Sequence, residues 1–105
     1  MDDRDVAFMP AFELSALISS KQISPVELTE VYLRRIDKFD SSLNAYLTVD
    51  TEGVVEAAKE AEQAVIKKER LGPLHGIPIS IKDLELTKGI RTTSGSLVYK
   101  DRVPE

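Results

Sequence analysis

Apolar residues recur at helical spacing along the first part of the chain. Leu14, Leu17 and Ile18 fall on one face and predict a short amphipathic helix over residues 11–20. A longer helix is expected to follow, because apolar residues again return every three or four positions and the charged residues lie largely off that face. The stripe of this longer helix consists of Leu28, Val31, Tyr32, Ile36 and Phe39.

The start of the longer helix carries the clearest local signal in the chain. Ser24 can accept a hydrogen bond from the backbone of the first turn, and Glu27 can bond back to the N–H of Ser24. Pro25 stands at the first helical position, where a missing N–H costs nothing. We therefore predict a helix with Ser24 as its N-cap.

A third helix is predicted after a polar break. Asp50 or Thr51 can cap it, and the turn at Gly72–Pro73 is expected to end it. Its apolar face is rich in alanine, so a neighbouring element can approach closely. The residues of this face are Val54, Ala57, Ala58, Ala61 and Val65.

Two later segments have the features of strands. Ile77, Ile79 and Ile81 recur with the period of two that is typical of a β-strand. Because Pro78 has no N–H to donate to a sheet, we expect it to lie near the start of this strand or on the edge of the sheet. Residues 45–49 form a second short apolar run, which we also interpret as a strand.

The order of these elements predicts an α/β fold. A helical front over about residues 11–70 precedes a strand and loop over about residues 74–100. Because two strands make a poor sheet by themselves, we interpret residues 1–105 as an N-terminal fragment of a single domain. A second copy of the chain or another protein could complete the sheet.

Composition and charge narrow the setting of the protein. The chain is 42% hydrophobic and 30% charged, and its net charge of −4 gives no reason to expect direct binding to nucleic acid. The absence of cysteine excludes disulfides and thiolate chemistry within these residues. The acidic N-terminus is unlike a signal peptide, and no apolar run is long enough for a membrane span. We therefore expect a cytoplasmic protein without membrane contact.

Lys82 is the first candidate for chemistry. On the strand interpretation it projects, with Ser80, from the face opposite the isoleucines and close to the strand's C-terminal end, where sheet edges commonly host sites. A lysine that is partly desolvated there can lose its proton and act as a general base. The alternative is a solvated lysine that closes the strand, which periodicity alone favours.

Several polar residues surround this lysine in the sequence. His75 could assist proton transfer, although a lone histidine in a turn more often bonds to backbone groups. The hydroxyl-rich loop from Thr92 to Ser96 could line a pocket; the alternative is a polar turn that caps a short helix. Asp83 could bond to the backbone of its loop, but adjacent strand residues face opposite ways, so we expect no ion pair with Lys82.

One histidine among scattered carboxylates is too little for a metal site, and no cofactor is expected.

Four strings become informative when they are taken together and in order. They are SPVEL at residues 24–28, LNAY at 43–46, GIPISIKD at 76–83 and TTSGS at 92–96. This combination resembles the amidase-signature family, and the third string is similar to that family's lysine motif. The matches cover most of the chain.

The resemblance implies a mixed-sheet fold and an amidase that converts carboxamides to carboxylic acid and ammonia. In that family a lysine deprotonates a bridging serine, which activates a second serine that forms the acyl-enzyme. Lys82 matches the position of the lysine. The residues that match supporting positions near the site are Asp83, Thr93, Ser94, Gly95 and Ser96.

The two serines of that family lie well downstream of its lysine motif, and nothing in this chain matches them. A base without its nucleophile cannot form an acyl-enzyme, so we expect the 105 residues alone to be inactive.

Three functions remain open from the sequence. The first is the N-terminal part of an amidase whose substrate is a small or aryl carboxamide. The second is the A subunit of a tRNA-dependent glutamine amidotransferase, which shares the fold and motif and would pass ammonia to a partner. The third is a non-catalytic module that associates with itself or another protein through exposed apolar faces.

Overall fold

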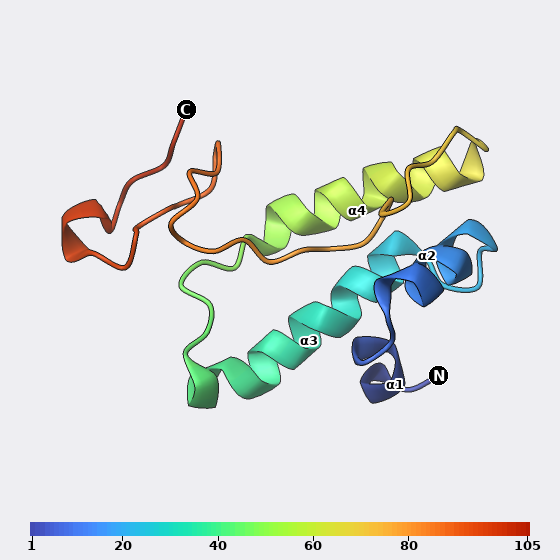
Figure 1. Ribbon diagram of the computed structural model, residues 1–105, viewed down its shortest axis with the longest axis horizontal. Helices are drawn as coiled ribbons and strands as arrows, with labels where there is room; N and C mark the ends of the chain where they lie inside the picture. The colour runs from blue at the N-terminus through green and yellow to red at the C-terminus, as the bar shows by residue number, and fades with distance from the viewer.

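Helices provide all the regular structure in the computed structural model, which describes all 105 residues (Figure 1). In chain order the elements are α1 (Asp3–Ala7), α2 (Ala11–Ser19), α3 (Pro25–Leu43), α4 (Thr51–Ile66) and a 3₁₀ helix (Leu97–Tyr99). A long irregular segment separates α4 from the 3₁₀ helix. None of the helices is both long and apolar enough to cross a bilayer.

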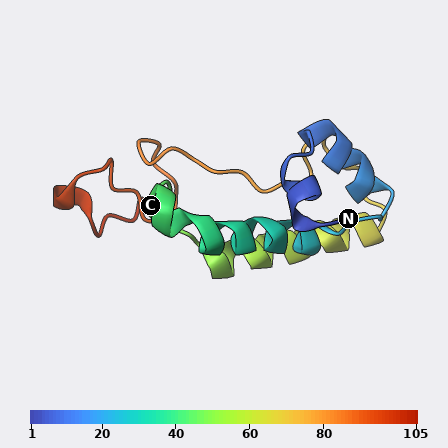
Figure 2. The same ribbon diagram turned by 90° about the horizontal axis from the view of Figure 1, so that it is seen from below.

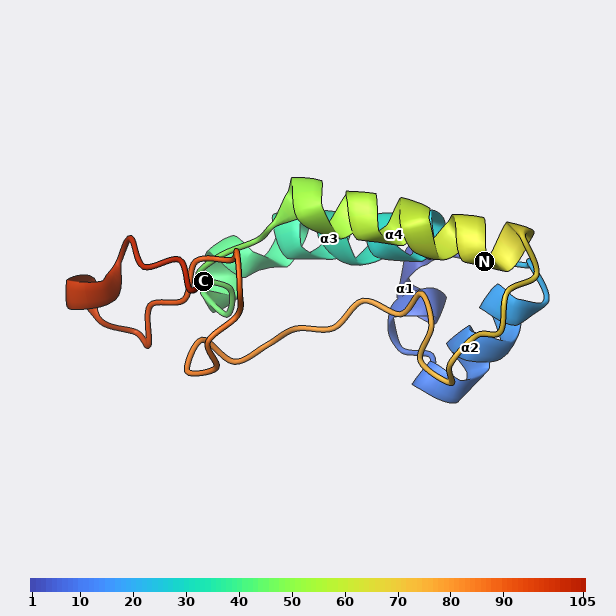
Figure 3. The same cartoon turned by 90° about the horizontal axis from the view of Figure 1, so that it is seen from above.

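The two long helices, α3 and α4, run antiparallel and side by side (Figure 1). The short helices α1 and α2 and the chain that follows α4 lie on one side of this pair, as Figures 2 and 3 show from two directions. The 3₁₀ helix extends beyond one end of the pair. The radius of gyration is 15.0 Å, compared with about 13 Å for a compact domain of this length, so the molecule is elongated.

The core lies where α1, α2 and the beginning of α3 meet the end of α4. Leu14 and Ile18 of α2 and Leu28 of α3 are each at most 2% exposed, which confirms the predicted apolar faces in this region. Burying a side chain of this size contributes about 1.5–3 kcal/mol. The buried cluster consists of Val6, Leu14, Ile18, Leu28, Val31 and Val65.

The predicted helix starts are confirmed. Ser24 Oγ accepts a hydrogen bond from the backbone N–H of Glu27 (3.0 Å), and Ser24 N–H donates to Glu27 Oε2 (2.8 Å). Pro25 is the first residue of α3. At α4 the carboxylate of Asp50 accepts from the N–H of Gly53 at 3.2 Å.

The predicted α/β fold is wrong, because the structure contains no β-strand. In the segment 45–49, the carboxylate of Asp40 accepts hydrogen bonds from the N–H groups of Ala45 (2.8 Å) and Tyr46 (3.1 Å). Asn44 turns the chain there with a φ of 51°. Two donors that a strand would offer to a neighbour are thus bound by a side chain of α3.

The predicted strand at residues 77–81 is an irregular segment without a neighbour. Residues 78–81 make no hydrogen bond between backbone groups. Ile79 is 75% exposed and Ile81 is 51% exposed, so the alternating isoleucines do not share a buried face. A period of two identifies residues that suit a strand, but a ladder also needs a second segment alongside.

α4 ends well before the Gly72–Pro73 turn, contrary to the sequence-based prediction. Lys68 adopts a left-handed conformation with a φ of 56°. Its N–H donates to Val65 O (3.1 Å), and the N–H of Glu69 donates to Ala64 O (3.1 Å). This pair of bonds is the Schellman motif, which usually has glycine at the left-handed position.

α2 ends in the same way, with another lysine in the left-handed position. Lys21 has a φ of 61°, and its N–H donates to Ile18 O at 3.0 Å. The N–H of Gln22 donates to Leu17 O at 2.9 Å. The predicted range of α2, residues 11–20, agrees with its observed end at Ser19. The end of α4 was mispredicted because glycine, the usual residue at the left-handed position, stands only at Gly72.

Helix α1 was not predicted, because the first residues suggest only an acidic terminus. The carboxylate of Asp2 accepts a hydrogen bond from the N–H of Asp5 at 2.8 Å and caps the helix. Val6 of α1 is 2% exposed and joins the core. A helix of five residues with one buried side chain leaves no periodic signal in the sequence.

Candidate functional site

The segment that carries Lys82 is attached to the helical core at Gly76. Gly76 has a φ of 77°, and a Cβ atom at this position would lie 2.8 Å from Cγ of Pro25. Only glycine therefore suits both the conformation and the close approach to the start of α3. Ile77 packs against the buried cluster, so the lysine segment leaves the core directly after this residue.

His75 contributes to the same attachment. Its Nε2 lies 2.8 Å from the carbonyl oxygen of Ala61 in α4, which requires Nε2 to carry the donated hydrogen. The interpretation that this histidine bonds to a backbone group is confirmed, although the acceptor lies on a helix and not in the same turn. His75 therefore ties the turn before the lysine segment to α4.

Lys82 lies at the surface, on irregular chain and not on a strand. Its carbonyl oxygen accepts a hydrogen bond from the N–H of Glu85 (2.9 Å), which forms a turn. The ion pairs of the molecule join Arg34 to Asp3 and Lys59 to Glu56, so the ammonium group of Lys82 has no carboxylate partner.

Asp83, the next residue, is held tightly by the loop that was singled out from the sequence. Its carboxylate accepts hydrogen bonds from the N–H of Thr93 (2.8 Å), the hydroxyl of Thr93 and the N–H of Gly95 (3.2 Å). Its backbone carbonyl accepts from the N–H of Ser94 at 3.0 Å. The structure therefore brings together Asp83, Thr93, Ser94 and Gly95.

These hydrogen bonds hold the pKa of the Asp83 carboxyl below its usual range. The hydroxyl of Thr93 has the largest effect, followed by the N–H of Thr93, because both donors favour the ionised form. Partial burial opposes them, while the N–H of Gly95 and the positive charge of Arg91 lower the pKa further. Asp83 is thus an ionised anchor for the loop.

The loop is also held from its other side by Arg102. The guanidinium of Arg102 donates to Thr92 O (2.8 Å) and to Ser94 Oγ (2.8 Å), and it stacks on the ring of Tyr99 at 4.2 Å. Thr92 and Thr93 are 2% and 3% exposed. Sequence reasoning missed Arg102, because an arginine eight to ten residues after its partners leaves no distinctive pattern.

Ser96 has a separate role in the loop. Its hydroxyl accepts a hydrogen bond from the N–H of Val98 at 3.2 Å and caps the 3₁₀ helix Leu97–Tyr99. The interpretation of this loop as a polar turn that caps a short helix is therefore confirmed. Ser96 does not join the hydrogen bonds around Asp83.

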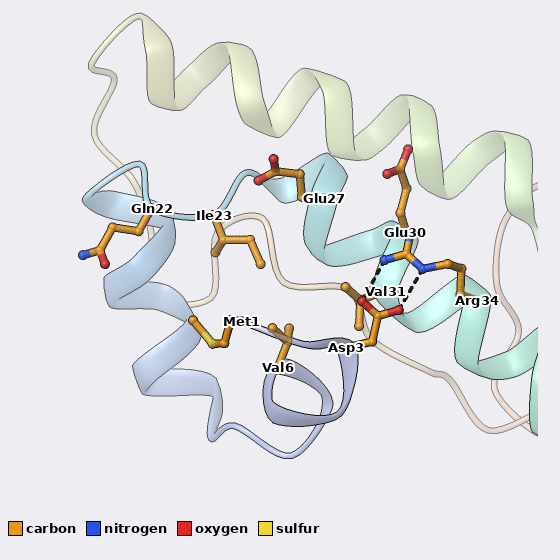
Figure 4. A pocket seen from close by; sticks show the side chains of 9 residues that line it. All are labelled: Met1, Asp3, Val6, Gln22, Ile23, Glu27, Glu30, Val31 and Arg34. Carbon is orange, nitrogen blue, oxygen red and sulfur yellow. Dashed lines mark hydrogen bonds and ion pairs between the residues drawn. The ribbon is translucent and has the colours of Figure 1, made fainter.

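A cleft of about 290 Å³ lies elsewhere, between α1 and α3 (Figure 4). The guanidinium of Arg34 donates to both carboxylate oxygens of Asp3 at 2.8 and 2.9 Å, and these bonds lower the pKa of Asp3. None of the site residues predicted from the sequence faces this cleft. Its lining consists of Met1, Asp3, Val6, Gln22, Ile23, Glu27, Glu30, Val31 and Arg34.

Lys82 and the loop around Asp83 lie in a part of the chain that matches a known protein family. Residues 27–105 match the Amidase family, a range that contains Lys82 and the whole Asp83 loop. The chain belongs to this family of amidase-signature hydrolases. The resemblance carried by the four sequence strings is therefore confirmed, although the fold expected from it is not.

Among curated proteins, the chain is similar to the A subunit of glutamyl-tRNA(Gln) amidotransferase from several organisms. It is 40% identical over 100 residues to that of Salinispora tropica, which covers 95% of this chain and 20% of the relative. It is 40% identical over 96 residues to that of Cutibacterium acnes, which covers 91% and 19%. For Aromatoleum aromaticum the identity is 45% over 84 residues, covering 80% and 17%. The chain thus spans about a fifth of the length of the curated relatives it matches.

Proposed function

We propose that this chain supplies the catalytic lysine of an amidase-signature active site, and that the site belongs to the A subunit of a tRNA-dependent glutamine amidotransferase. The observation that carries the proposal is the pairing of an exposed Lys82, free of any carboxylate, with an Asp83 that is fully engaged by its loop. Lys82 would be the base, and the loop from Thr93 to Ser96 would support it.

The chemistry requires a base of this kind. A serine hydroxyl is a weak nucleophile at neutral pH and attacks an amide only when a neighbouring base removes its proton. A lysine bound in an ion pair would be held in its protonated form, which cannot accept a proton. The lack of a carboxylate partner for Lys82 is therefore consistent with this role.

The names of the relatives favour an amidotransferase component over a free amidase. Matches of 40% identity extend over nearly the whole chain for the proteins of Salinispora tropica and Cutibacterium acnes. The substrate would be glutamine, and the ammonia would pass to a partner protein. Exposed apolar side chains such as Ile79, Leu86 and Leu97 would give this segment a surface to pack against the remainder of such an enzyme.

A chimera tests this proposal. The 105-residue chain would replace the matching fifth of the Salinispora tropica protein, and release of ammonia from glutamine would be measured. We expect the chimera to hydrolyse glutamine and Lys82→Ala to lower kcat by about 100- to 10,000-fold, the usual contribution of a general base.

Lys88→Ala is the matched control, since Lys88 is an exposed lysine on the same segment. We expect this variant to retain the activity of the unsubstituted chimera. Full activity of the Lys82→Ala chimera would contradict the proposed role of the lysine. A folded chimera that releases no ammonia from glutamine would contradict the assignment to an amidotransferase subunit.

A further inference from the structure

Lys82 is attached to the rest of the molecule almost entirely through its neighbour. Residues 78–81 make no hydrogen bonds between backbone groups, so the chain is unsupported from the core contact of Ile77 up to the lysine. The first fixed point after this stretch is Asp83, which receives four hydrogen bonds from the loop. Because Lys82 is the residue before Asp83, the hydrogen bonds that fix Asp83 also fix the backbone position of Lys82.

The loop that binds Asp83 is itself anchored by buried residues and by Arg102. Thr92 and Thr93 are buried, and Arg102 binds the loop at Thr92 O and Ser94 Oγ. The N–H of Thr92 also donates to Arg102 O at 2.9 Å, so the two segments are joined in both directions. Asp83 on one side and Arg102 on the other therefore hold the loop between them.

We infer that Asp83 is a positioning residue for Lys82: by binding Thr93 and Gly95 it sets the place from which the lysine reaches its proton donor. This inference rests on the proposed function of Lys82. Asp83 itself does not touch the reacting atoms, because both of its carboxylate oxygens are occupied by donors of the loop.

The same chimera tests the inference through kinetics. Asp83→Asn and Thr93→Val each remove part of the hydrogen bonding and should lower kcat with little change in KM, since a displaced base affects the chemical step and not the binding of substrate. A shift of about 1 Å in a catalytic group can cost about 100-fold in rate. Thr93→Ser keeps the hydroxyl and should restore most of the kcat lost in Thr93→Val.

Asp101→Asn is the matched control, because Asp101 is an exposed aspartate that accepts no hydrogen bond from a side chain or from the loop. A second measurement uses the 105-residue chain itself: hydrogen exchange of the Thr93 and Gly95 amides should be faster in Asp83→Asn than in the parent. Unchanged exchange would overturn the inference even if the enzyme variant failed to fold.

The outcomes distinguish the positioning role of Asp83 from the proposed role of Lys82. Loss of activity in Lys82→Ala together with an unchanged kcat in Asp83→Asn would overturn the positioning role alone. Unchanged activity in Lys82→Ala would overturn the proposed function. Equal losses in Thr93→Val and Thr93→Ser, or a rise in KM without a fall in kcat, would also contradict the positioning role.

Discussion

At the scale of single residues, Asp83 and Lys82 show how two neighbours can have opposite environments. The carboxylate of Asp83 is surrounded by donors from Thr93 and Gly95, whereas the ammonium of Lys82 has no carboxylate partner. The negative charge is used within the protein to hold a loop. The lysine next to it has no ion pair that would hold it in its protonated form.

The lowered pKa of Asp83 predicts a pH dependence of the loop. A carboxyl whose pKa is lower in the folded than in the unfolded state contributes stability above its usual pKa of 3.8, and this contribution is lost as the pH falls through the folded-state pKa. The backbone amide shifts of Thr93 and Gly95, followed by NMR from neutral to acidic pH, should therefore move with a midpoint below 3.8. Asp83→Asn should abolish this transition. A midpoint at or above 3.8 would contradict the observed hydrogen bonding.

Hydrogen bonds between residues close together in the sequence could be predicted, whereas those between residues far apart in the sequence could not. The capping bonds of Ser24 and Glu27 join residues three apart, so their residue types alone predict them. The bonds between Asp83 and Thr93 span ten residues of irregular chain, where no periodicity relates donor to acceptor. Lys82 and its loop were candidates from residue type and spacing, but only their resemblance to a family favoured a catalytic role over a solvated lysine and a polar turn.

At the scale of elements, the three predicted helices were confirmed and the two predicted strands were wrong. A helix closes its hydrogen bonds within itself, so an apolar stripe is enough to identify α2, and capping residues together with such a stripe identify α3 and α4. A strand needs a partner that sequence periodicity cannot supply. The run at 45–49 gives its donors to Asp40, and the run at 77–81 has no neighbour.

The two lysines in Schellman motifs lead to a stability prediction. Lys68 has a φ of 56°, a conformation that costs a residue with a side chain about 1–2 kcal/mol relative to glycine. Lys68→Gly should therefore raise the free energy of unfolding by about 1 kcal/mol, measured by chemical denaturation.

Lys67→Gly is the matched control. Lys67 has a φ of −76°, so glycine relieves no strain there and should lower the free energy of unfolding by about 0.5–1 kcal/mol. If both variants were equally destabilised, the left-handed conformation of Lys68 would be contradicted.

At the scale of the whole molecule, the helical half, which ends with α4 at Ile66, buries more apolar surface than the lysine-bearing half that follows it. The helical half contains the buried cluster, whereas Leu97 and Val98 near the end of the chain are 87% and 83% exposed. This difference accounts for the elongated shape with its radius of gyration of 15.0 Å. It also fits the proposal that the second half packs against the remainder of a longer family polypeptide.

Family membership could be predicted at this scale, but the fold of the chain could not. The four ordered strings are short and contiguous in the sequence, so recognising them does not depend on how the chain folds. The α/β expectation depended on contacts between segments that this structure does not make.

The rate of acylation tests the central claim, that Lys82 is the base of an amidase-signature site, more directly than steady-state turnover. The chimera and its Lys82→Ala variant would be mixed with glutamine, quenched at short times, and analysed by intact mass for the acyl-enzyme. We expect the acyl-enzyme to accumulate in the chimera and to form about 100-fold or more slowly in the variant, because the lysine acts before the first covalent step. Acylation of the Lys82→Ala variant at the rate of the unsubstituted chimera would contradict the account.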